Sequence, residues 1–385
     1  MKLLADVAAS CVAISIGYYI AASLAALRFA IRVSSPAPPV PETAPSVAIL
    51  KPLRGLTEDL RNKIISYLEL DYASVEYYFG VSDNRDRAAE VPTSLRDSYP
   101  QKQITLVVGA EPGCSNRKVA KLIAMAEQVP DTDIIVIGDA DIAVDRDHLR
   151  RLVGELAADP KKGVISCMYR ARPSGSLASR LEALSVNTDF TPMVMLSAAV
   201  EPVRYALGAT IAIKRAALEQ IGGFHAIKDY LADDFHLGKL AADHNWDIGL
   251  SSSIVTTVAH EQTFGDFWNH QLRWARTYRT TRPLSLATIT THGPFWGLIL
   301  LLASRGSCFA VALFLFLIAA RLAMSTLMLR NVLRLPELMR DVWLVPLKDL
   351  CMTGIWFTSL FGNQVEWAGR RLEILANGTI REVDG

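Results

Sequence analysis

The chain has 385 residues, enough for one large domain or two ordinary ones. Lysine and arginine number 40 against 39 for aspartate and glutamate, so no global electrostatic field favours nucleic acid as a partner. The five cysteines are scattered without a C-x-x-C pair, which indicates neither a disulfide framework nor a zinc site and agrees with a reducing compartment. Hydrophobic residues reach 51 %, and the excess gathers in long runs toward both ends of the chain.

The first apolar run, Val7–Leu27, carries no charge over 21 residues. A helix needs about 20 apolar residues to cross a bilayer, so this run predicts a membrane span. It is longer than the apolar region of a signal peptide and lacks a clear small-residue cleavage site, which favours an anchor over residues 1–33. Five prolines within residues 34–45 predict a linker behind this anchor.

Strand-like and helix-like stretches alternate from Ser46 onward. Strands are predicted at Val47–Leu50, Glu76–Val81, Ile104–Val108 and Ile134–Gly138, with helices ending near Leu70, Arg96 and Gln128. This order predicts an α/β domain over residues 46–262, with a Rossmann-like, mostly parallel sheet and helices on both faces. Ser115 is the expected cap of the third helix. Such sheets bind ligands at the carboxyl ends of their strands.

Three aspartates follow predicted strands. Asp83 closes the second strand, while Asp139 and Asp141 follow the fourth, one residue apart. Two such carboxylates can reach one hard cation, Mg²⁺ or Mn²⁺, which would hold a diphosphate. The alternative is a turn, with both acids solvated or capping a helix that begins near Asp145. A phosphatase of the haloacid dehalogenase type also has D-x-D after a strand, but Ala143 at its fifth position and the long preceding segment do not suit that fold.

A second pair of acids, Asp233 and Asp234, precedes a helical stretch. Negative charge at a helix N-terminus adds about 0.3–1 kcal/mol to helix stability, so the pair has a structural use whatever its chemistry. The nearby histidines lack the spacing of metal ligands and are expected to be structural or surface residues: His225, His236, His244 and His260.

Residues 263–282 are predicted to form an amphipathic helix at the membrane interface, because their apolar residues share one helical face and the segment leads into an apolar run. Arg276 and Arg279 lie mostly off that face, and contact with lipid headgroups is expected for them. Arg273 beside Trp274 is the better candidate for a functional site.

Two more apolar runs, Leu284–Ser304 and Gly306–Leu329, are long enough to span a membrane. Basic residues flank the central segment on both sides, which places it in the cytoplasm by the positive-inside tendency: Arg28, Arg32, Arg276, Arg279 and Arg282. The stretch Val342–Gln364 contains two charges and could span, re-enter or lie on the surface. Residues 283–364 are therefore expected to form a C-terminal membrane region, followed by a tail over 365–385.

The order of these motifs resembles that of inverting, family-2-like glycosyltransferases of the GT-A fold: Asp83, Asp139-Ala-Asp141, Asp233-Asp234 and Arg273-Trp274. The chain is more closely similar to glycosyltransferase family 21, the ceramide glucosyltransferases, and to bacterial hopanoid-associated glycosyltransferases. Four short stretches look like that family too: Leu50–Gly55, Glu69–Tyr72, Asn116–Lys118 and Ile221–Phe224. The resemblance runs from about Val47 to Arg279 and includes the flanking spans. The set is specific to the family, although no single element is.

Two positions depart from the family's pattern. The last motif usually begins with Gln or Arg, and here that position is His270, with Gln271 displaced by one, so no grip on the diphosphate is assigned to it. The acid motif commonly reads Glu-Asp-Tyr and is Asp-Asp-Phe here, which retains the second acid as Asp234.

For the donor, the resemblance implies a UDP-sugar. Asp83 would contact the nucleoside, with Lys118 assisting there. Asp139 and Asp141 would hold the diphosphate through a divalent metal, Mg²⁺ or Mn²⁺.

For the transfer step, the resemblance implies Asp234 as the general base that takes the proton of an acceptor hydroxyl, a role worth about 10²–10⁴-fold in rate. Arg273 would offset charge on the leaving diphosphate, and Trp274 would shape the acceptor site. The acceptor would be a membrane lipid, because the protein is expected to be an integral, multi-pass membrane protein. Transfer of one glucose to ceramide is the first expectation, and N-acetylglucosamine to a hopanoid polyol is the second.

Two other functions were weighed against this one. A processive polysaccharide synthase is disfavoured because two or three carboxyl-side spans offer little material for a polymer channel. A non-catalytic membrane scaffold would be expected to lose the base or the D-x-D pair, and both are present.

Overall fold

The computed structural model describes residues 2–57, 59–260 and 263–383. The chain divides into two compact units. The sheet unit comprises Ser35–Tyr169 and Glu201–Thr257, and the helical unit comprises Met1–Ser34, Arg170–Val200 and Val258–Gly385. Residues 170–200 therefore belong with the helical unit, although the sequence placed them inside the domain 46–262. The predicted boundary at residue 262 falls on residues outside the described part of the chain.

The sheet unit is built on a mixed sheet, which confirms the predicted α/β class. Its strands lie in the order β3-β2-β1-β4-β6-β5-β7. Their bounds are β1 Val47–Pro52, β2 Val75–Val81, β3 Gln103–Val108, β4 Ile134–Gly138, β5 Lys162–Pro173, β6 Thr210–Lys214 and β7 Asp247–Ala259. The first four strands are parallel, and β6 runs antiparallel to both β4 and β5.

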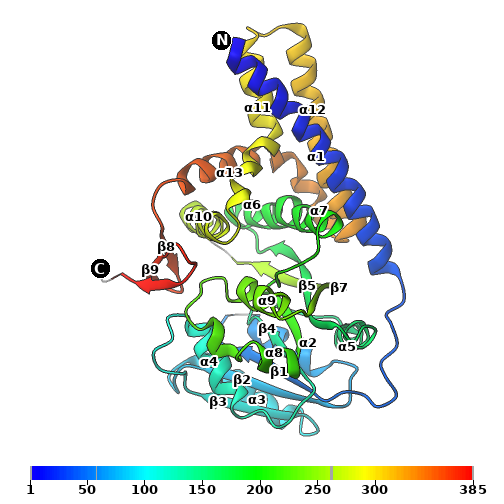
Figure 1. The fold of residues 1–385 in the computed structure, drawn as a ribbon, viewed down its shortest axis with the longest axis vertical. Helices are drawn as coiled ribbons and strands as arrows, with labels where there is room; N and C mark the ends of the chain where they lie inside the picture. The colour runs from blue at the N-terminus through cyan, green and yellow to red at the C-terminus, as the bar shows by residue number, and fades with distance from the viewer. Residues whose placement is uncertain (1, 58, 261–262, 384–385) are drawn as a thin grey trace. The chain divides into compact units, whose positions relative to one another are not determined.

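Helices cover both faces of this sheet, as the alternation of strands and helices predicts (Figure 1). One face holds α2 (Leu60–Leu68), α3 (Glu90–Ser98) and α5 (His148–Ala157), and the other holds α4 (Arg117–Ala126), α8 (Arg215–Gln220) and α9 (Asp233–Asp243). The central strands β1 and β4 are buried along their whole length, which is typical of parallel strands covered on both sides. Ile49 packs in the core on the first face and Leu50 in the core on the second, because successive side chains of a strand point to opposite faces of the sheet.

The predicted helix cap at Ser115 is one residue too early. Asn116 caps α4, because its side-chain oxygen accepts hydrogen bonds from the backbone N–H groups of Lys118 and Val119. Asn and Ser are equally good N-caps in isolation, so local preference did not separate the two positions.

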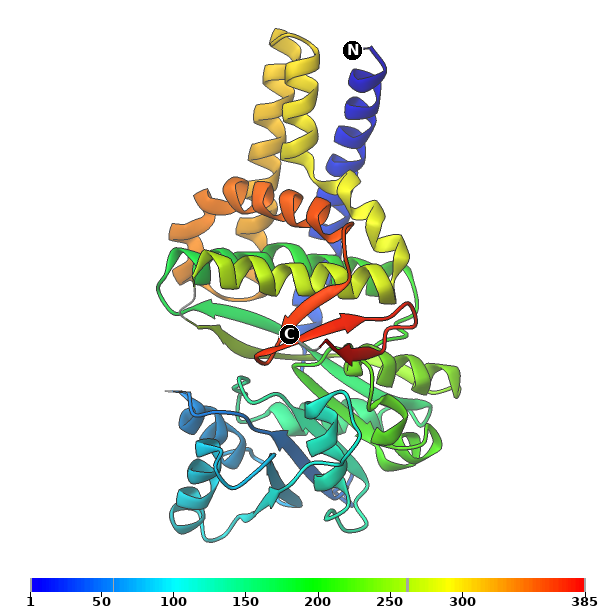
Figure 2. The same ribbon diagram turned by 90° about the vertical axis from the view of Figure 1, so that its left-hand side faces the viewer.

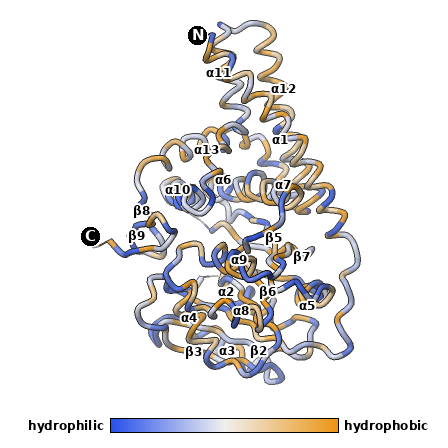
Figure 3. The backbone as a smooth tube through the Cα atoms, viewed as in Figure 1, coloured by the Kyte–Doolittle hydropathy of each residue, from blue (hydrophilic) through white to orange (hydrophobic). Residues whose placement is uncertain are grey.

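The helical unit contains the apolar helices. Among its described residues, α1 (Lys2–Ser34) and α12 (Cys308–Leu327, continued as a π-helical turn over Met328–Val332) are long and apolar enough to cross a membrane. These helices and α11 pack side by side (Figure 2) and are largely apolar along their length (Figure 3).

The run predicted as one span at Leu284–Ser304 is bent. A 3-10 helix over Pro283–Thr291 and α11 over Gly293–Ala303 meet at an angle of 55°, so the pair is either a broken span or a re-entrant loop. The break falls at His292, whose φ of −77° and ψ of 66° are not helical, and Pro294 lies in the first turn of α11, where its missing N–H costs no helical hydrogen bond.

The rest of the helical unit comprises α6 (Leu177–Ser185), a π-helical turn (Val186–Phe190), α7 (Thr191–Val200), α10 (Phe264–Thr281), a 3-10 helix (Pro336–Leu344) and α13 (Val345–Ser359). The predicted tail is not irregular, because it forms an antiparallel sheet of β8 (Gln364–Trp367), β9 (Arg370–Ile374) and β10 (Ile380–Glu382).

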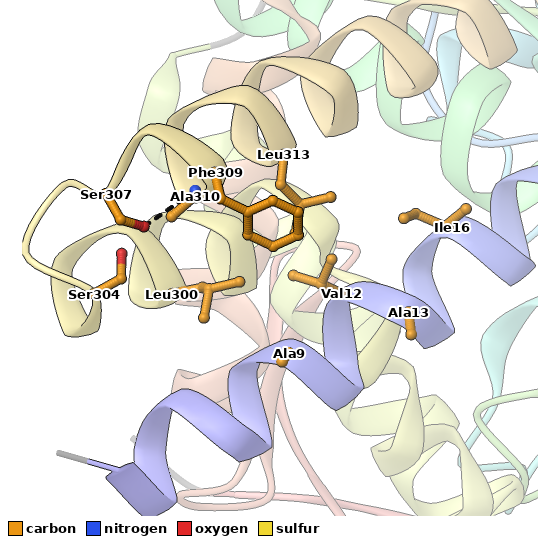
Figure 4. A pocket seen from close by; sticks show the side chains of 10 residues that line it. All are labelled: Ala9, Val12, Ala13, Ile16, Leu300, Ser304, Ser307, Phe309, Ala310 and Leu313. Carbon is orange, nitrogen blue, oxygen red and sulfur yellow. Dashed lines mark hydrogen bonds between the residues drawn. The ribbon is translucent and has the colours of Figure 1, made fainter.

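An apolar groove of about 380 Å³ lies between α1, α11 and α12 (Figure 4). It is lined by Ala9, Val12, Ala13, Ile16, Leu300, Ser304, Ser307, Phe309, Ala310 and Leu313. Because the lining is almost entirely hydrocarbon, it suits apolar chains and offers nothing to bind a sugar or a phosphate.

Candidate active site

The D-x-D turn lies where the order of the parallel strands reverses. From β1 the chain adds β2 and β3 on one side and then returns to place β4 on the other. The carboxyl ends of β1 and β4 diverge at this topological switch point, which is the usual ligand crevice of an open α/β sheet.

A buried lysine donates hydrogen bonds to the backbone of the D-x-D turn. Lys51, at the end of β1, is fully buried, and its Nζ donates to the backbone oxygen of Asp139 at 2.5 Å and to that of Ile142 at 3.3 Å. The same ammonium lies 4.1 Å from the ring centroid of Tyr67. Burial lowers the pKa of Lys51 to about 7, although the neighbouring acids act against this. Gly138 leaves room for this arrangement, since a Cβ there would come within 2.6 Å of the Tyr67 hydroxyl.

The two carboxylates of the turn have different partners. Oδ1 of Asp139 pairs with Nζ of Lys118 at 2.8 Å, whereas Oδ2 of Asp141 accepts a hydrogen bond from Thr257 Oγ1 at 2.5 Å. Each acid therefore keeps a second oxygen to which no described residue is bonded. Burial raises the pKa of Asp139, Lys118 acts against it, and the charge of Asp141 adds to it.

Lys118 connects the two acid motifs. Its Nζ also pairs with Oδ2 of Asp233 at 3.1 Å. Burial alone would lower the pKa of Lys118, but Asp139, Asp233 and Asp234 raise it above its ordinary value. Asn116 adds a hydrogen bond of 3.4 Å to Oδ1 of Asp233. In the structure, Lys118 pairs with these carboxylates, and the role beside the nucleoside that the resemblance implies for it stays a prediction.

Asp234 occupies the first turn of α9. Its Oδ1 accepts a hydrogen bond from the backbone N–H of Phe235 at 2.8 Å. Burial, followed by the charge of Asp233, raises the pKa of Asp234 to about 6. Gly208 approaches the carboxylate closely, because a Cβ at that position would lie 2.9 Å from Oδ2 of Asp234. A carboxylate with a pKa near neutrality is suited to accept a proton at physiological pH.

The residues present fit a divalent cation. Within the described parts of the chain, no group of three or more His, Cys, Asp or Glu side chains could hold a metal by itself. Mg²⁺, however, is usually bound by one or two carboxylates together with substrate phosphates and water. Asp139 and Asp141 can supply those carboxylates.

Asp83 follows β2 at the same edge of the sheet. Its contacts are local: Oδ1 accepts a hydrogen bond from the backbone N–H of Arg85 at 2.7 Å, and its carbonyl accepts one from Asp86. The structure brings Asp139, Asp233, Asp234 and Lys118 together, with Asp141 beside them, and leaves Asp83 outside this network of contacts.

Arg273 and Trp274 lie on α10, in the helical unit. The Trp274 ring contacts those of His270, Phe190 and Tyr278, at centroid distances of 5.2, 5.7 and 6.4 Å. This aromatic cluster places Trp274 in a fixed environment on its own unit.

The displaced motif residues His270 and Gln271 share one partner. His270 Nδ1 lies 2.7 Å from Oε1 of Glu182 on α6, and Gln271 Nε2 donates to the same oxygen at 2.9 Å. These side chains therefore join α10 to α6. Sequence spacing could not reveal this, because Glu182 lies 88 positions before His270.

The expectation of headgroup contact for Arg276 and Arg279 does not match their hydrogen bonds. Arg276 donates to the backbone oxygens of Phe361 and Gln364, and Arg279 donates to those of Ser359 and Gly362. Both guanidinium groups thus bind the connection from α13 to β8, and Arg279 also binds the last carbonyl of α13, where the helix dipole favours positive charge.

Four residues had no role in the sequence-based prediction: Lys51, Tyr67 and Thr257, which surround the acids of the sheet unit, and Glu182, which binds His270 and Gln271 within the helical unit. Lys51 offered one usable signal, since it is a lone charge within an otherwise apolar strand. The remaining three become visible only when distant parts of the chain are brought together.

The fold and the D-x-D turn at its switch point define a glycosyltransferase with a GT-A domain. The chain belongs to glycosyl transferase family 21, whose family model matches residues 7–380.

Relatives of known activity agree with this class. The chain is 21 % identical over 234 residues to ceramide glucosyltransferase 1 of Caenorhabditis elegans, covering 61 % of this chain and 50 % of that one. It is 26 % identical over 266 residues to the beta-monoglucosyldiacylglycerol synthase of Synechocystis sp., covering 66 % and 53 %. The chain thus spans about half the length of these relatives.

A solved structure shares the fold. The mannosyltransferase PcManGT from Pyrobaculum calidifontis, in complex with GDP-Man and Mn²⁺, matches with a TM-score of 0.60 at 20 % identity, covering 93 % of this chain and 99 % of that one. At this identity the similarity concerns the fold.

Proposed function

We propose that this glycosyltransferase inverts the anomeric carbon of a UDP-sugar as it transfers a single hexose, glucose, to the hydroxyl of a ceramide-type lipid. The observation that carries the proposal is the grouping of Asp234 with Asp139, Asp233 and Lys118 at the carboxyl end of the sheet. It provides a proton acceptor and a diphosphate-binding turn within one network of charges.

Asp139 and Asp141 would hold a divalent cation through their remaining oxygens. When bound, the cation would neutralise the charge of the diphosphate as it departs. Lys51 fixes the backbone of the turn, so the two carboxylates keep their directions before the donor arrives. Asp83 is proposed to contact the nucleoside.

Asp234 would take the proton of the acceptor hydroxyl. The acceptor oxygen forms a bond to the anomeric carbon while the bond from that carbon to the diphosphate oxygen breaks on the opposite side, so the configuration inverts and UDP leaves. No covalent enzyme intermediate is needed. Gly208 leaves room for the Asp234 carboxylate, because a Cβ at that position would lie 2.9 Å from its Oδ2. Arg273 is proposed to offset charge on the leaving diphosphate, and Trp274 to shape the acceptor site.

A lipid acceptor is supported by two observations. The helical unit carries candidate membrane spans, and ceramide and diacylglycerol lipids appear in the names of related enzymes. The second candidate is transfer of N-acetylglucosamine to a hopanoid polyol, which fits the same acid pair and the same membrane attachment.

The test uses the full chain in phospholipid vesicles with Mg²⁺ or Mn²⁺. UDP-glucose or UDP-N-acetylglucosamine is supplied with ceramide, a hopanoid polyol or diacylglycerol, and new lipids are identified by mass. We expect monohexosyl ceramide with the β configuration by NMR, and none from the D234N variant. A product from another pair would replace the donor or acceptor named here. Sugar polymer without a lipid product would overturn lipid transfer, and no product with any pair would favour a scaffold.

A further inference from the structure

The segment around α13 presents a stripe of large apolar side chains to the outside of its unit. The stripe consists of Trp343, Leu347, Leu350, Phe357 and Phe361, which are 68, 44, 49, 44 and 72 % exposed. Leu347, Leu350 and Phe357 lie on α13, where intervals of three and seven residues keep them on one helical face. Trp343 belongs to the preceding 3-10 helix, and Phe361 follows the end of α13. A contiguous exposed stripe of this kind marks an interaction surface.

The opposite face of α13 is buried and charged. Lys348 is fully buried, and its Nζ lies 2.5 and 2.6 Å from the two carboxylate oxygens of Asp189 and 2.5 Å from Asp349. Asp349 in turn pairs with Arg321 of α12 at 2.9 Å. Rotating the stripe inward would break this network and leave buried charges unpaired, a change that typically costs several kcal/mol. The outward orientation of the stripe is therefore built into the fold.

The direction and length of α13 exclude a simple membrane span. It lies across the base of the upright helices α11 and α12 (Figures 1 and 2). Its 15 residues extend about 22 Å, which is shorter than the roughly 30 Å of a hydrocarbon core. Arg279 binds the last carbonyl of α13, that of Ser359, and Arg276 binds the Phe361 carbonyl just beyond the helix.

The partner must match both charge and apolar surface. The connection from α12 to α13 carries three exposed arginines, Arg330, Arg334 and Arg340, and basic residues beside an apolar face are typical of helices that lie on anionic lipid surfaces. The helix that carries the stripe also packs against α11 and α12, the apolar helices of the same unit.

We propose that α13 is a membrane-interface helix whose stripe of Trp343, Leu347, Leu350, Phe357 and Phe361 enters the boundary between lipid headgroups and acyl chains. Its partner is the phospholipid bilayer itself. The sheet β8–β10 then lies on the same side of the membrane as the C-terminal end of α1. The position of α13 at the membrane does not depend on which sugar the enzyme transfers or on which acceptor it uses.

The depth of position 350 tests this directly. The full chain carries Leu350→Cys with a nitroxide label, after Cys114, Cys308 and Cys351 are replaced by serine, in vesicles of phosphatidylcholine and phosphatidylglycerol. We expect the label about 5–10 Å below the phosphates from its accessibility to oxygen and to a nickel chelate. Two matched controls bracket it: Leu315→Cys, exposed on the span α12, should be deeper, and Arg371→Cys, exposed on β9, should be in water.

A depth at position 350 equal to that at 315 would overturn the proposal, because it would show that α13 inserts into the hydrocarbon core. Full exposure of the label to the chelate would also overturn it, because it would show that the stripe lies in water. Spin–spin broadening at 350 would show a second copy on the stripe and overturn the lipid assignment. A reporter fused to the C-terminus gives an independent reading: it should lie on the same side as one fused after Ser46, whereas a spanning α13 would place it on the other.

Discussion

The Asp234 carboxylate is buried beside the charged Asp233, and the missing side chain of Gly208 leaves room for it. Asp234→Asn keeps the size of the side chain but cannot take the acceptor's proton. Turnover should fall at least about a hundredfold, while the Kd for the UDP-sugar stays within a few-fold. Asp243→Asn, at the exposed end of the same helix, is the matched control and should retain turnover. Near-normal turnover in the Asp234 variant would remove it from the role of base.

The raised pKa of Asp234 makes a prediction about pH. The base is active only when deprotonated, so kcat/KM for the acceptor should rise with pH through about 6 and level off above it. Activity rises with pH because only the carboxylate form of Asp234 can accept a proton. A profile in D234N that keeps the same rise near pH 6 would assign the titration to another group.

A substitution at Gly208 tests the position of the Asp234 carboxylate without changing its chemistry. A Cβ at this position would lie 2.9 Å from Oδ2 of Asp234, so Gly208→Ala must displace that side chain. We expect kcat to fall about tenfold or more while KM for the donor changes little, because a displacement of roughly 1 Å strongly weakens proton transfer. The thermal unfolding midpoint in detergent serves as the control and should shift by only a few degrees. An unchanged kcat would show that the base tolerates the shift.

Much of the residue-level site could be predicted because its acids follow strands or precede a helix. Asp139, Asp141 and Asp234 were identified from local position and from the order of motifs. Lys51 and Thr257 could not be, since their partners lie 88 and 116 positions away. The family resemblance gave Lys118 a place near the nucleoside, whereas in the folded chain its charge is balanced by two acid motifs.

At the scale of elements, the D-x-D turn is a short loop whose backbone is fixed by Lys51 and whose side chains remain available. If it holds a metal, chelator should abolish transfer and Mg²⁺ or Mn²⁺ should restore it. Asp141→Ala should raise the metal concentration for half-maximal activity by about tenfold or more. Thr257→Val, which removes only the hydroxyl that donates to Asp141, should have a smaller effect. Full activity in excess chelator would show that Asp139 and Asp141 bind no metal and form only a structural turn.

The predicted strands of the sheet agree with those observed to within two residues, because long buried strands have a strong apolar signal. The membrane helices were predicted as runs, but the bend at His292–Pro294 and the antiparallel sheet in the tail were not. Composition indicates where a segment is apolar. It does not indicate where a helix breaks, because the freed backbone groups are satisfied by neighbours that are remote in sequence.

At the scale of the whole molecule, the candidate catalytic residues and the apolar helices are concentrated in different units. The sheet unit holds the acids and the lysines of the site, while the helical unit holds the apolar helices and the buried charge network around Arg321. The chain passes between the units four times, so residues 170–200 belong with the helices although strands lie on either side of them in sequence. A contiguous domain boundary, which is all that a sequence pattern can propose, could not describe this interleaving.

The orientation of the molecule in the membrane is the last prediction. A UDP-sugar pool is cytoplasmic, and the arginines that flank the sheet unit favour the same side by the positive-inside tendency. A reporter fused after Ser46 should therefore show a cytoplasmic location, and one inserted in the turn Arg305–Ser307 should lie on the opposite side. Replacing Arg28 and Arg32 by Gln should weaken this preference, and Lys102→Gln, within the sheet unit, is the control for loss of positive charge away from the spans. A reporter after Ser46 on the far side of the membrane would separate the site from its proposed donor and contradict the mechanism.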